Sequence, residues 1–531
     1  MGKKYTESEL NSLSKEELIS LFLSVQTMAD DLSKKLDLLL EQMNISKQRQ
    51  FGRSSEKMVC DGQLSLNLDL ALNEAEATIT GLYVVEPEFE QICPRPYTRK
   101  KAKGKREEEL KDLPVKVINH ELSEEELTSR LGPKWKRLPD EVYKRLVFHP
   151  ATFEVEEHHV AVYAGMDGQT IIRGKRPADL LRNSIVTPSL EAAIINNKYV
   201  NAVPLYRMEQ EFLRNDIRIS RQVMANWTIQ CAERYLSLLY DLLHQELYKA
   251  NILQADETSV LVSKDGRPAG SRSYMWVYRT GKMYESNPII LYEYQKTRNT
   301  SHPREFLKGY SGTVVTDGYQ VYHTLEKERE DLKIAGCWSH ARRHFANVTK
   351  ALGKEKAKGT LAEEALKRIA AIYKLENELQ HLTAGERQQQ RQLKIKPHVD
   401  AFFAWVKSHL LELLPKSETA KGFTYCINQE KYLRVFLEDG NVPLDNNAAE
   451  AAIRSFCIGR ANWHLIDTIE GAKASAIIYS IVETAKANRL KPYNYFEHLL
   501  TEIPKHMDDK NLDFLDDLLP WSEKLPESCR R

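Results

Sequence analysis

Long apolar runs are missing from this sequence of 531 residues. No stretch approaches the roughly 18 apolar residues that a membrane-spanning helix needs. The first residues, Met-Gly-Lys-Lys-Tyr-Thr, lack the apolar centre of a secretory signal. These absences exclude the membrane and secreted classes, so we expect a cytoplasmic protein without membrane contact.

Closely spaced cysteine pairs are missing as well. Seven cysteines are scattered along the chain without a C-x-x-C pair: Cys60, Cys93, Cys231, Cys337, Cys426, Cys457 and Cys529. This spacing excludes a disulfide framework and a zinc ribbon, and it favours reduced thiols.

A charge excess of either sign is also missing. With 76 Lys and Arg against 75 Asp and Glu, the net charge is +1, so any contact with nucleic acid must come from local patches. The densest patch is PRPYTRKKAKGKR, residues 94–106, with seven basic residues among thirteen. Such a run is either a solvated linker or a contact to the DNA backbone through Arg99, Lys100 and Lys101.

The N-terminal part of the chain combines a helical stripe with β-like runs. Over residues 10–51, apolar residues recur at steps of three and four, at Leu18, Leu21, Val25, Met28, Leu32, Leu36, Leu39 and Met43. This coiled-coil spacing predicts either a dimer or a helix that packs on the rest of its own chain. Residues 111–182 alternate short β-like runs with turn signals, which predicts a small β-rich module.

Two short helices are predicted next, in PLYRMEQEFLRN and SRQVMANWTIQCAERYL, with Ser220 as the N-cap of the second. Their tight connection is typical of a helix-turn-helix, in which Arg218, Arg221 and Gln222 would begin the helix that approaches DNA. An ordinary helical hairpin fits the same pattern.

From residue 251 the apolar period changes from 3.6 to 2. We predict strands in ILQADETSVLVS, SYMWVYRT, NPIILYEYQ, GTVVTDGY and LKIAGCWSH, with helices after the fourth and the fifth. Three strands with short connections, followed by βα units, describe a mixed sheet of the ribonuclease-H-like kind. Residues 341–440 are almost wholly helical by pattern. Residues 446–487 predict a helix, a short loop or strand around GRANWHLI, and a second helix.

Two carboxylates belong to the predicted strands. Asp256 lies among apolar residues in LQADETSV, and because an unpaired buried carboxylate is costly, it should be hydrogen-bonded, near a strand end, or on a metal. Asp317, in VVTDGYQVY, is expected to project from the C-terminal end of its strand, the edge where ligands bind in α/β sheets. Phosphodiester cleavage and strand transfer use such acids to hold two Mg²⁺ ions, which Mn²⁺ should be able to replace, and three acids are the minimum.

Glu450, in LDNNAAEAAIR, is the best candidate for the third acid. Its alanine neighbours would let the helix approach the sheet closely, and Arg454, one turn later, could meet a phosphate. Taken alone, a helical glutamate is more often a solvated surface residue. Glu257, beside Asp256, points to the opposite face of the strand and should not be a ligand.

A second cluster lies in CWSHARRHF. Cys337, His340 and His344 have the spacing C-x2-H-x3-H, which is half of a zinc site, but no fourth ligand with suitable spacing is near, so no zinc is expected. Instead, His340, Arg342 and Arg343 are expected at a strand-to-helix junction near the acids, in contact with DNA phosphate. A capped, solvated helix start is the alternative.

These stretches resemble bacterial transposases of the insertion sequence 66 family, which belongs to the DDE group. The matching stretches occur in the family's order: QRQFGRSSEKM, PLYRMEQEFL with ISRQVMANW, LQADETSV, VVTDGYQVY, CWSHARRHF, LDNNAAEAAIR with GRANW, and GAKASAIIYSIVETAKANRLKPYNYFEHLL. The resemblance implies that Asp256, Asp317 and Glu450 are the catalytic acids and hold two Mg²⁺ ions, and that the protein cuts element-end DNA and joins it to target DNA. A non-catalytic element-end binding or regulatory protein and a ribonuclease-H-like junction nuclease are the alternatives.

The resemblance also implies an α+β multidomain chain. Its parts would be a zipper-like helix (1–58), a linker with the basic run (59–110), the β-rich module (111–182), the helix-turn-helix (183–248), the first part of the ribonuclease-H-like core (249–345), a helical insertion (346–440), the second part of the core (441–488) and a C-terminal segment (489–531). Implied partners are a second copy or a higher oligomer through the N-terminal helix and small accessory proteins of the same element, with a nucleoid-associated location in a bacterial cytoplasm.

Three features depart from the family pattern. Residues 111–182 contain no cysteine where the family usually carries a zinc module, so that metal should be absent. Ala451 stands where an arginine usually follows the acid, so a DNA contact is expected to be lost or moved to Arg454. After GRANW the chain reads HLIDT in place of the usual aromatic residue, glycine and serine, which affects local substrate contacts but not the acids.

Overall fold

The computed structural model describes residues 14–28, 43, 152–164, 171–173, 179–268, 270–283 and 287–531. The basic run with Arg99, Lys100 and Lys101 lies outside these residues, as does most of the predicted β-rich module. The described part of that module includes a short antiparallel pair, β1 (Val162–Ala164) and β2 (Ile171–Arg173). The described residues from 179 onward belong to a different compact unit from β1 and β2.

The N-terminal stripe is described over residues 15–28, which are helical as predicted. Several apolar side chains of this helix are exposed: Leu18, Ile19, Phe22, Leu23, Val25 and Met28. Within the described ranges, no helix combines the length and the apolar character needed to cross a membrane.

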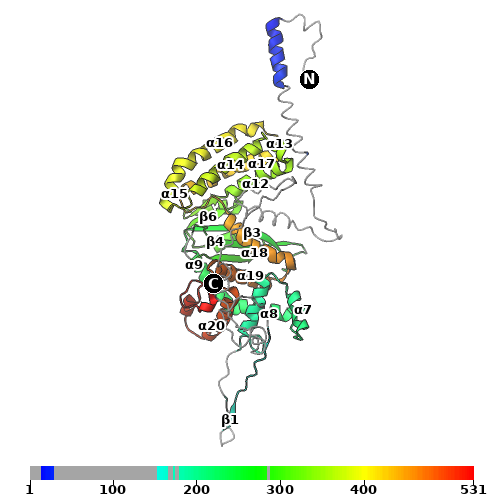
Figure 1. The fold of residues 1–531 in the computed structure, drawn as a ribbon, viewed down its shortest axis with the longest axis vertical. Coiled ribbons are helices and arrows are strands. Elements are labelled where there is room, and N and C mark those ends of the chain that lie inside the picture. Colours follow the sequence, from blue (N-terminus) through cyan, green and yellow to red (C-terminus); the bar gives the residue numbers. More distant parts are fainter. Residues whose placement is uncertain are drawn as a thin grey trace, which may run out of the picture. The chain divides into compact units, whose positions relative to one another are not determined.

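A mixed sheet organises the unit that begins at residue 179 (Figure 1). Its strands are β3 (Ile252–Lys264), β4 (Arg272–Thr280), β5 (Ile290–Gln295), β6 (Gly312–Thr316) and β7 (Leu332–Gly336), in the order β5-β4-β3-β6-β7. β4 is antiparallel to both β3 and β5, whereas β6 and β7 run parallel to β3. A short strand, β8 (Ile466–Thr468), pairs with the far end of β3. The five predicted strands and the mixed α/β core are therefore confirmed.

Helices precede, interrupt and follow these strands. They are α6 (Pro188–Ile195), α7 (Leu205–Arg214), α8 (Arg221–Cys231), α9 (Ser237–Leu247), α10 (Ser301–Phe306), α11 (Gln320–Glu328), α12 (Trp338–Leu352), α13 (Lys354–Ala357), α14 (Leu361–Glu378), α15 (Ala384–Gln390), α16 (Lys396–His409), α17 (Glu418–Leu433), α18 (Asn447–Trp463), α19 (Ile469–Ala487) and α20 (Pro492–Glu502). Short 3₁₀ or π turns are η1 (Asn196–Val200), η2 (Ala232–Leu236), η3 (Arg391–Ile395), η4 (Leu410–Glu412), η5 (Val435–Leu437), η6 (Ile503–His506), η7 (Asp513–Leu518) and η8 (Glu527–Cys529). The predicted helices after the fourth and fifth strands are α11 and α12.

The outer edge of β5 is covered by α19. The Thr484 hydroxyl accepts a hydrogen bond from the Ile290 amide at 3.0 Å, and the Ser480 hydroxyl accepts one from the Tyr292 amide at 2.7 Å. An uncovered edge strand would leave these amides free to pair with another chain. The helix therefore closes this side of the sheet.

A helical layer lies beyond the other end of the sheet order, and it extends from α12 to η5 (Figure 1). Its core gathers aromatic rings around Trp338, which contacts Phe402, Phe403 and Phe436. This core holds α12 and α17 together, and both helices supply side chains to the site described below.

The predicted helix pair is present as α7 and α8. The Ser220 hydroxyl accepts a hydrogen bond from the Val223 amide at 3.3 Å, which confirms the predicted N-cap. The second helix is longer than expected, because a π turn at η2 joins α8 directly to α9. Arg218, Arg221 and Gln222 are exposed where α8 begins.

The predicted order of a helix, a short loop or strand around GRANWHLI and a second helix is present, but the break begins later than predicted. α18 continues through GRANW to Trp463, and the strand β8 begins only at Ile466. Gly459 lies within α18, and a Cβ atom there would collide with the side chains of Trp463 and Tyr479. The glycine permits a close approach between α18 and α19.

Candidate active site

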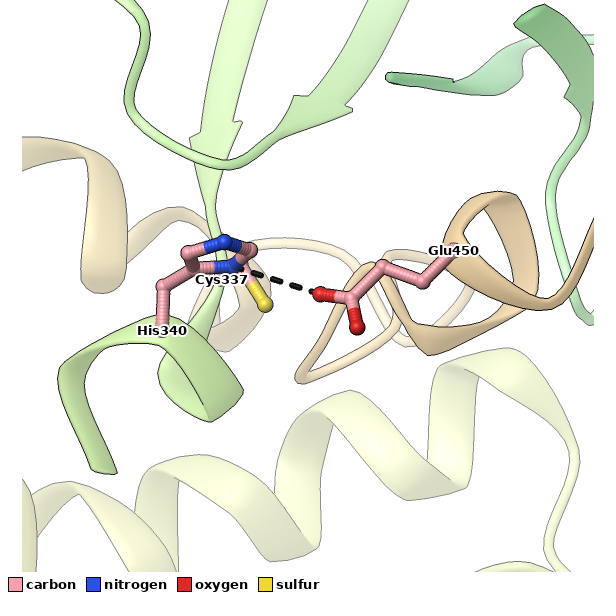
Figure 2. Close-up of side chains that lie close together, drawn as sticks. All are labelled: Cys337, His340 and Glu450. Atoms are coloured by element: carbon pink, nitrogen blue, oxygen red, sulfur yellow. Dashed lines mark ion pairs between the residues drawn. The ribbon is translucent and has the colours of Figure 1, made fainter. Parts of the chain in front are cut away.

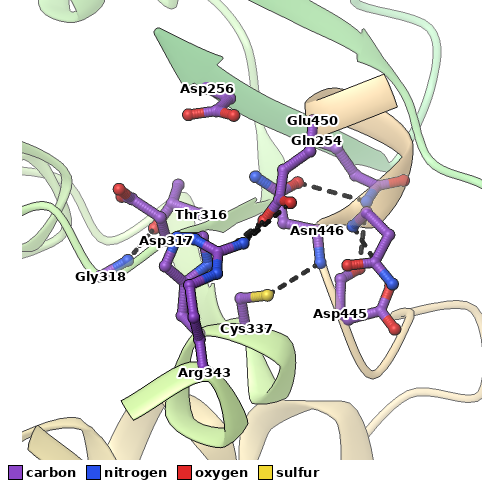
Figure 3. A network of polar contacts seen from close by, with 12 residues as sticks. Gln254, Asp256, Thr316, Asp317, Gly318, Cys337, Arg343, Asp445, Asn446 and Glu450 are labelled. Atoms are coloured by element: carbon purple, nitrogen blue, oxygen red, sulfur yellow. Dashed lines mark hydrogen bonds and ion pairs between the residues drawn. The ribbon is translucent and has the colours of Figure 1, made fainter. Parts of the chain in front are cut away.

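The parallel pairing of β3 and β6 brings Asp256 and Asp317 level with each other. Gln254 of β3 is paired with Val315 of β6, and the same register continued by two residues sets Asp256 opposite Asp317. β6 ends at Thr316, so Asp317 is the first residue beyond its C-terminal end, as predicted. Figure 3 shows both carboxylates in one region with Glu450.

The turn after β6 fixes the direction of Asp317. Its Oδ1 accepts a hydrogen bond from the Tyr319 amide at 2.9 Å, and its backbone carbonyl accepts one from the Tyr425 hydroxyl of α17 at 2.8 Å. Gly318 has a φ of 93°, which a residue with a side chain adopts only with strain. A Cβ atom at this glycine would also lie 3.0 Å from the Tyr425 hydroxyl. The turn is therefore built around a glycine.

The helix that carries Glu450 is anchored to β3 next to Asp256. Asn446, fully buried at the N-cap of α18, donates from Nδ2 to the Ala255 carbonyl at 2.8 Å. Its Oδ1 accepts from Gln254 Nε2 at 3.2 Å, and the same Nε2 also contacts the Asp445 carbonyl at 3.1 Å. These bonds join the start of α18 to the residues immediately before Asp256.

Contacts farther along α18 keep it against the sheet. Arg279 Nη1 of β4 donates to the Ala448 carbonyl at 3.1 Å, and Ala449 and Ala452 are buried. Of the four alanines around Glu450, Ala451 is exposed, so the prediction that all four serve close packing is only partly right.

Glu450 is held by side chains from α12. Arg343 Nη2 donates to its Oε1 at 3.1 Å and to its Oε2 at 3.0 Å. His340 Nδ1 lies 3.4 Å from Oε1, and the His340 Nε2 accepts from Arg343 Nη1 at 2.9 Å. The glutamate side chain is 9% exposed, whereas those of His340 and Arg343 are about a fifth exposed, at 20% and 21%.

Electrostatics couple the acids. Burial raises the pKa of Asp256 well above its usual range, and the negative charges of Glu257, Asp317 and Glu450 raise this pKa further. Burial also raises the pKa of Asp317, while the Arg298 and Arg343 guanidinium groups oppose that rise. A bound cation would stabilise the ionised, carboxylate form of these groups.

Glu257 lies on the other face of β3, as predicted. Arg298 Nε donates to its Oε1 at 2.7 Å, and the Arg298 guanidinium stacks on the Tyr319 ring at 3.7 Å. Burial raises the pKa of Glu257 to about 7, and the Asp317 carboxylate adds to this effect. Glu257 therefore holds Arg298, which packs on the residue two positions after Asp317, while its charge still acts on the acids.

The remaining predicted site residues lie at different distances from the acids. Arg342 is exposed on α12, and its charge acts on Tyr373 of α14, so the structure does not bring it to the acids with His340 and Arg343. Arg454 is half-buried on α18, and its Nη2 is buried without a hydrogen bond to any described residue. Arg221 stacks on the Tyr206 ring, 5.5 Å from its centroid.

Sequence reasoning missed the anchor residues Gln254 and Asn446. A signal was available, because Gln254 is two residues before Asp256 and so shares its strand face, and Asn446 belongs to the Asp-Asn-Asn stretch just before α18. Their pairing across 192 positions of the chain is visible only in the fold.

A mixed sheet with acids on β3 and after β6, and a third acid on a helix packed across β3, is consistent with a ribonuclease-H-like domain of the DDE type. The family model "Transposase IS66 family" matches residues 183–474, more than half of the chain. The model "IS66 C-terminal element" matches residues 480–521, and "Transposase C of IS166 homeodomain" matches residues 38–118. The chain belongs to the IS66 transposase family.

Three uncharacterized proteins of Sinorhizobium fredii (strain NBRC 101917 / NGR234) are similar over most of their length. The protein y4qI is 29% identical over 392 residues, which cover 72% of this chain and 71% of y4qI. The protein y4hP is 27% identical over 404 residues, covering 74% and 72% of the two chains, and y4jD is 26% identical over 362 residues, covering 67% and 69%.

Proposed function

We propose that this IS66-family protein is a Mg²⁺-dependent transposase that cuts DNA at the ends of an insertion sequence and joins the freed ends to target DNA. The observation that carries the proposal is the convergence of Asp256, Asp317 and Glu450 from β3, the turn after β6, and α18. Asp256, Asp317 and Glu450 are the proposed catalytic acids.

The donor set fits divalent magnesium. The three side chains offer hard carboxylate oxygens, and burial, followed by the negative charges of neighbouring carboxylates, raises the pKa of Asp256. Asp256 and Asp317 would hold two Mg²⁺ ions, with Glu450 completing the set, and Mn²⁺ would substitute. Bound there, the ions would supply activation of the attacking oxygen and stabilisation of the leaving oxygen of the phosphodiester.

The protein's own groups would orient the DNA. Arg343 and His340 lie beside Glu450 and are partly exposed, so they can meet a phosphate that enters the site. Burial lowers the pKa of His340 to about 3, and the Arg343 guanidinium adds to this effect, so the imidazole is neutral at physiological pH. Arg343 therefore supplies the positive charge and His340 a neutral hydrogen-bonding group.

DNA binding away from the acids would use the α7–α8 connection and the basic run. Arg218, Arg221 and Gln222 are exposed together at the start of α8. The basic run with Arg99, Lys100 and Lys101 would add sequence-independent attraction to the backbone. The exposed apolar side chains of residues 15–28 support self-association through the N-terminal helix. Arg454 is proposed as a further phosphate contact.

The test measures cleavage and binding on the same duplex, taken from the inverted repeats that flank the gene. Asp256→Asn, Asp317→Asn and Glu450→Gln should each abolish Mg²⁺-dependent nicking and strand transfer, while gel-shift binding survives. Glu293→Gln is the matched control, because Glu293 is also a buried sheet carboxyl, on β5, but is not part of this acid set. Strand transfer retained by any of the three variants would overturn the assignment. Binding by wild type without nicking would favour a non-catalytic protein, and cutting of junctions regardless of end sequence would favour a junction nuclease.

A further inference from the structure

Three side chains of different chemistry meet beside the proposed catalytic acids. Cys337 caps the start of α12, His340 follows one turn later, and Glu450 reaches them from α18 (Figure 2). The sulfur, one ring nitrogen and one carboxylate oxygen lie within 4.8 Å of one another. One sulfur, one nitrogen and one oxygen donor make a ligand set typical of zinc and unsuited to magnesium, which prefers oxygen alone.

The donor atoms are available to a metal. His340 Nδ1 is buried and makes no hydrogen bond to any described residue, although it lies 3.4 Å from Glu450 Oε1. His340 Nε2 accepts a hydrogen bond from Arg343 Nη1, so the neutral ring carries its proton on Nδ1, and this proton must move to Nε2 before Nδ1 can bind a metal. Cys337 is fully buried, and burial together with the Glu450 and Asp445 charges raises the pKa of its thiol. The Asn446 amide, which donates to the sulfur at 3.2 Å, opposes that rise, and a bound cation would favour the thiolate further.

We propose that Cys337, His340 and Glu450 form a binding site for Zn²⁺ or a similar soft divalent cation, and that its occupation switches off DNA cleavage. One carboxylate cannot serve both sites fully, because zinc draws Glu450 toward α12 and away from Asp256 and Asp317. Zinc binding itself does not depend on the proposed function, whereas the inhibition rests on it.

The ligand set differs from the one that the sequence suggested. The C-x2-H-x3-H spacing pointed to His344, but the ring of His344 lies 5.0 Å from that of Tyr425, on the side of α17. Glu450 takes the place of that histidine from more than a hundred positions away in the chain. With a water as fourth ligand, three protein ligands are enough for zinc, so the proposal departs from the expectation that no zinc is held.

Binding requires small, defined changes. Tetrahedral zinc ligands lie about 3–4 Å apart, so the three donors must close by about 1 Å. The Cys337 thiol releases its proton to solvent, and the single imidazole proton moves from Nδ1 to Nε2 when Nδ1 binds the metal. Arg343 Nη1, now 2.9 Å from Nε2, must turn away, while Nη2 can keep its contact with Glu450.

The binding test uses the full chain and metal alone. Wild type should bind one Zn²⁺ in competition with a chromophoric chelator, and Co²⁺ should give a thiolate-to-cobalt charge-transfer band. Cys337→Ser keeps a hydrogen-bond acceptor for Asn446 but should lose the band and bind zinc at least about a hundredfold more weakly. Cys529→Ser is the matched control, because Cys529 is also buried and its thiol donates to the Asn494 carbonyl at 3.5 Å.

A wild-type cobalt complex without the charge-transfer band would overturn the proposal, whether or not the variants fold. Zinc affinity unchanged in Cys337→Ser would overturn it as well. In Mg²⁺ reactions, zinc should stop cleavage by wild type and Cys529→Ser but not by Cys337→Ser. Zinc bound through Cys337 without any effect on cleavage would overturn the switch, whereas an absence of cleavage in Mg²⁺ alone would count against the proposed function and not against the zinc site.

Discussion

Replacement of Asn446 by alanine should loosen the helix that carries Glu450. The Asn446 side chain is fully buried and makes two hydrogen bonds, to the Ala255 carbonyl at 2.8 Å and from Gln254 Nε2 at 3.2 Å. Gln254 Nε2 keeps a second acceptor in the variant, the Asp445 carbonyl, so the main loss falls on Ala255. One buried group left without a partner costs about 1–3 kcal/mol, and the lost side-chain volume brings the expected loss of unfolding free energy to about 2–4 kcal/mol.

Cleavage should slow even though the variant stays folded. A displacement of a reacting group by about 1 Å can lower a rate on the order of a hundredfold. Asn446 fixes α18 directly beside Asp256, so its loss should displace Glu450 from the other acids. We therefore expect Asn446→Ala to remain folded and to bind end DNA but to cleave it on the order of a hundredfold more slowly.

The neighbouring asparagine provides the control. Asn447 Oδ1 is buried without a hydrogen bond to any described residue, so Asn447→Ala removes no such contact and should change stability by less than about 0.5 kcal/mol. Urea denaturation gives the free energies, and single-turnover nicking gives the rates. Equal stability losses in the two variants, with nicking intact in Asn446→Ala, would refute the anchoring role.

Three further outcomes follow from groups in and around the site. Asp256 keeps its proton to higher pH in the folded protein than in the unfolded chain, so unfolding releases a proton, and stability falls as pH rises from about 4 toward the raised pKa. Asp256→Asn should remove that fall in metal-free urea titrations. An unchanged fall in the variant would contradict the raised pKa. Burial raises the pKa of Glu191 from 4.5 to about 8, so the protein should likewise lose stability, on the order of a few kcal/mol, as pH rises from 4.5 to about 8. Glu191→Gln should flatten this loss. A stability curve like that of wild type would show that Glu191 ionises normally. Gly318→Ala should lower the free energy of unfolding by about 1–3 kcal/mol, because the positive φ and the Tyr425 hydroxyl both oppose a side chain there. Thermal or urea unfolding measures this loss, and nicking should also slow. Unchanged stability would exclude strain at this turn.

The sheet and its two aspartates could be predicted because local signals determine them. Period-2 apolar runs gave the five strands, and the valines before Asp317 with the glycine after it marked a strand end. Glu450 needed chemistry as well as pattern, since nothing local distinguishes it from a surface glutamate. The contact between Arg343 and Glu450 could not be predicted, because it depends on how α12 and α18 cross the sheet.

The end of α18 is the boundary that the sequence pattern placed too early. Glycine weakens an isolated helix by about 1 kcal/mol, so Gly459 in GRANW is a local signal against a continuous helix. In the fold, Gly459 leaves room for the Tyr479 side chain of α19 and the Trp463 ring one turn later in α18, and this packing outweighs the local preference. Tertiary packing of this kind cannot be predicted from neighbouring residues in the sequence.

The most direct test of the central claim is the metal preference of Asp256→Cys and Asp317→Cys in the nicking assay. Thiolate binds Mg²⁺ poorly and softer cations better. If a carboxylate holds the ion, its replacement by cysteine should make nicking depend on which cation is supplied. The account predicts that both variants are inactive in Mg²⁺ and regain part of their nicking in Mn²⁺. Full activity in Mg²⁺, or folded variants that Mn²⁺ rescues no better than Mg²⁺ does, would contradict metal binding by these two aspartates.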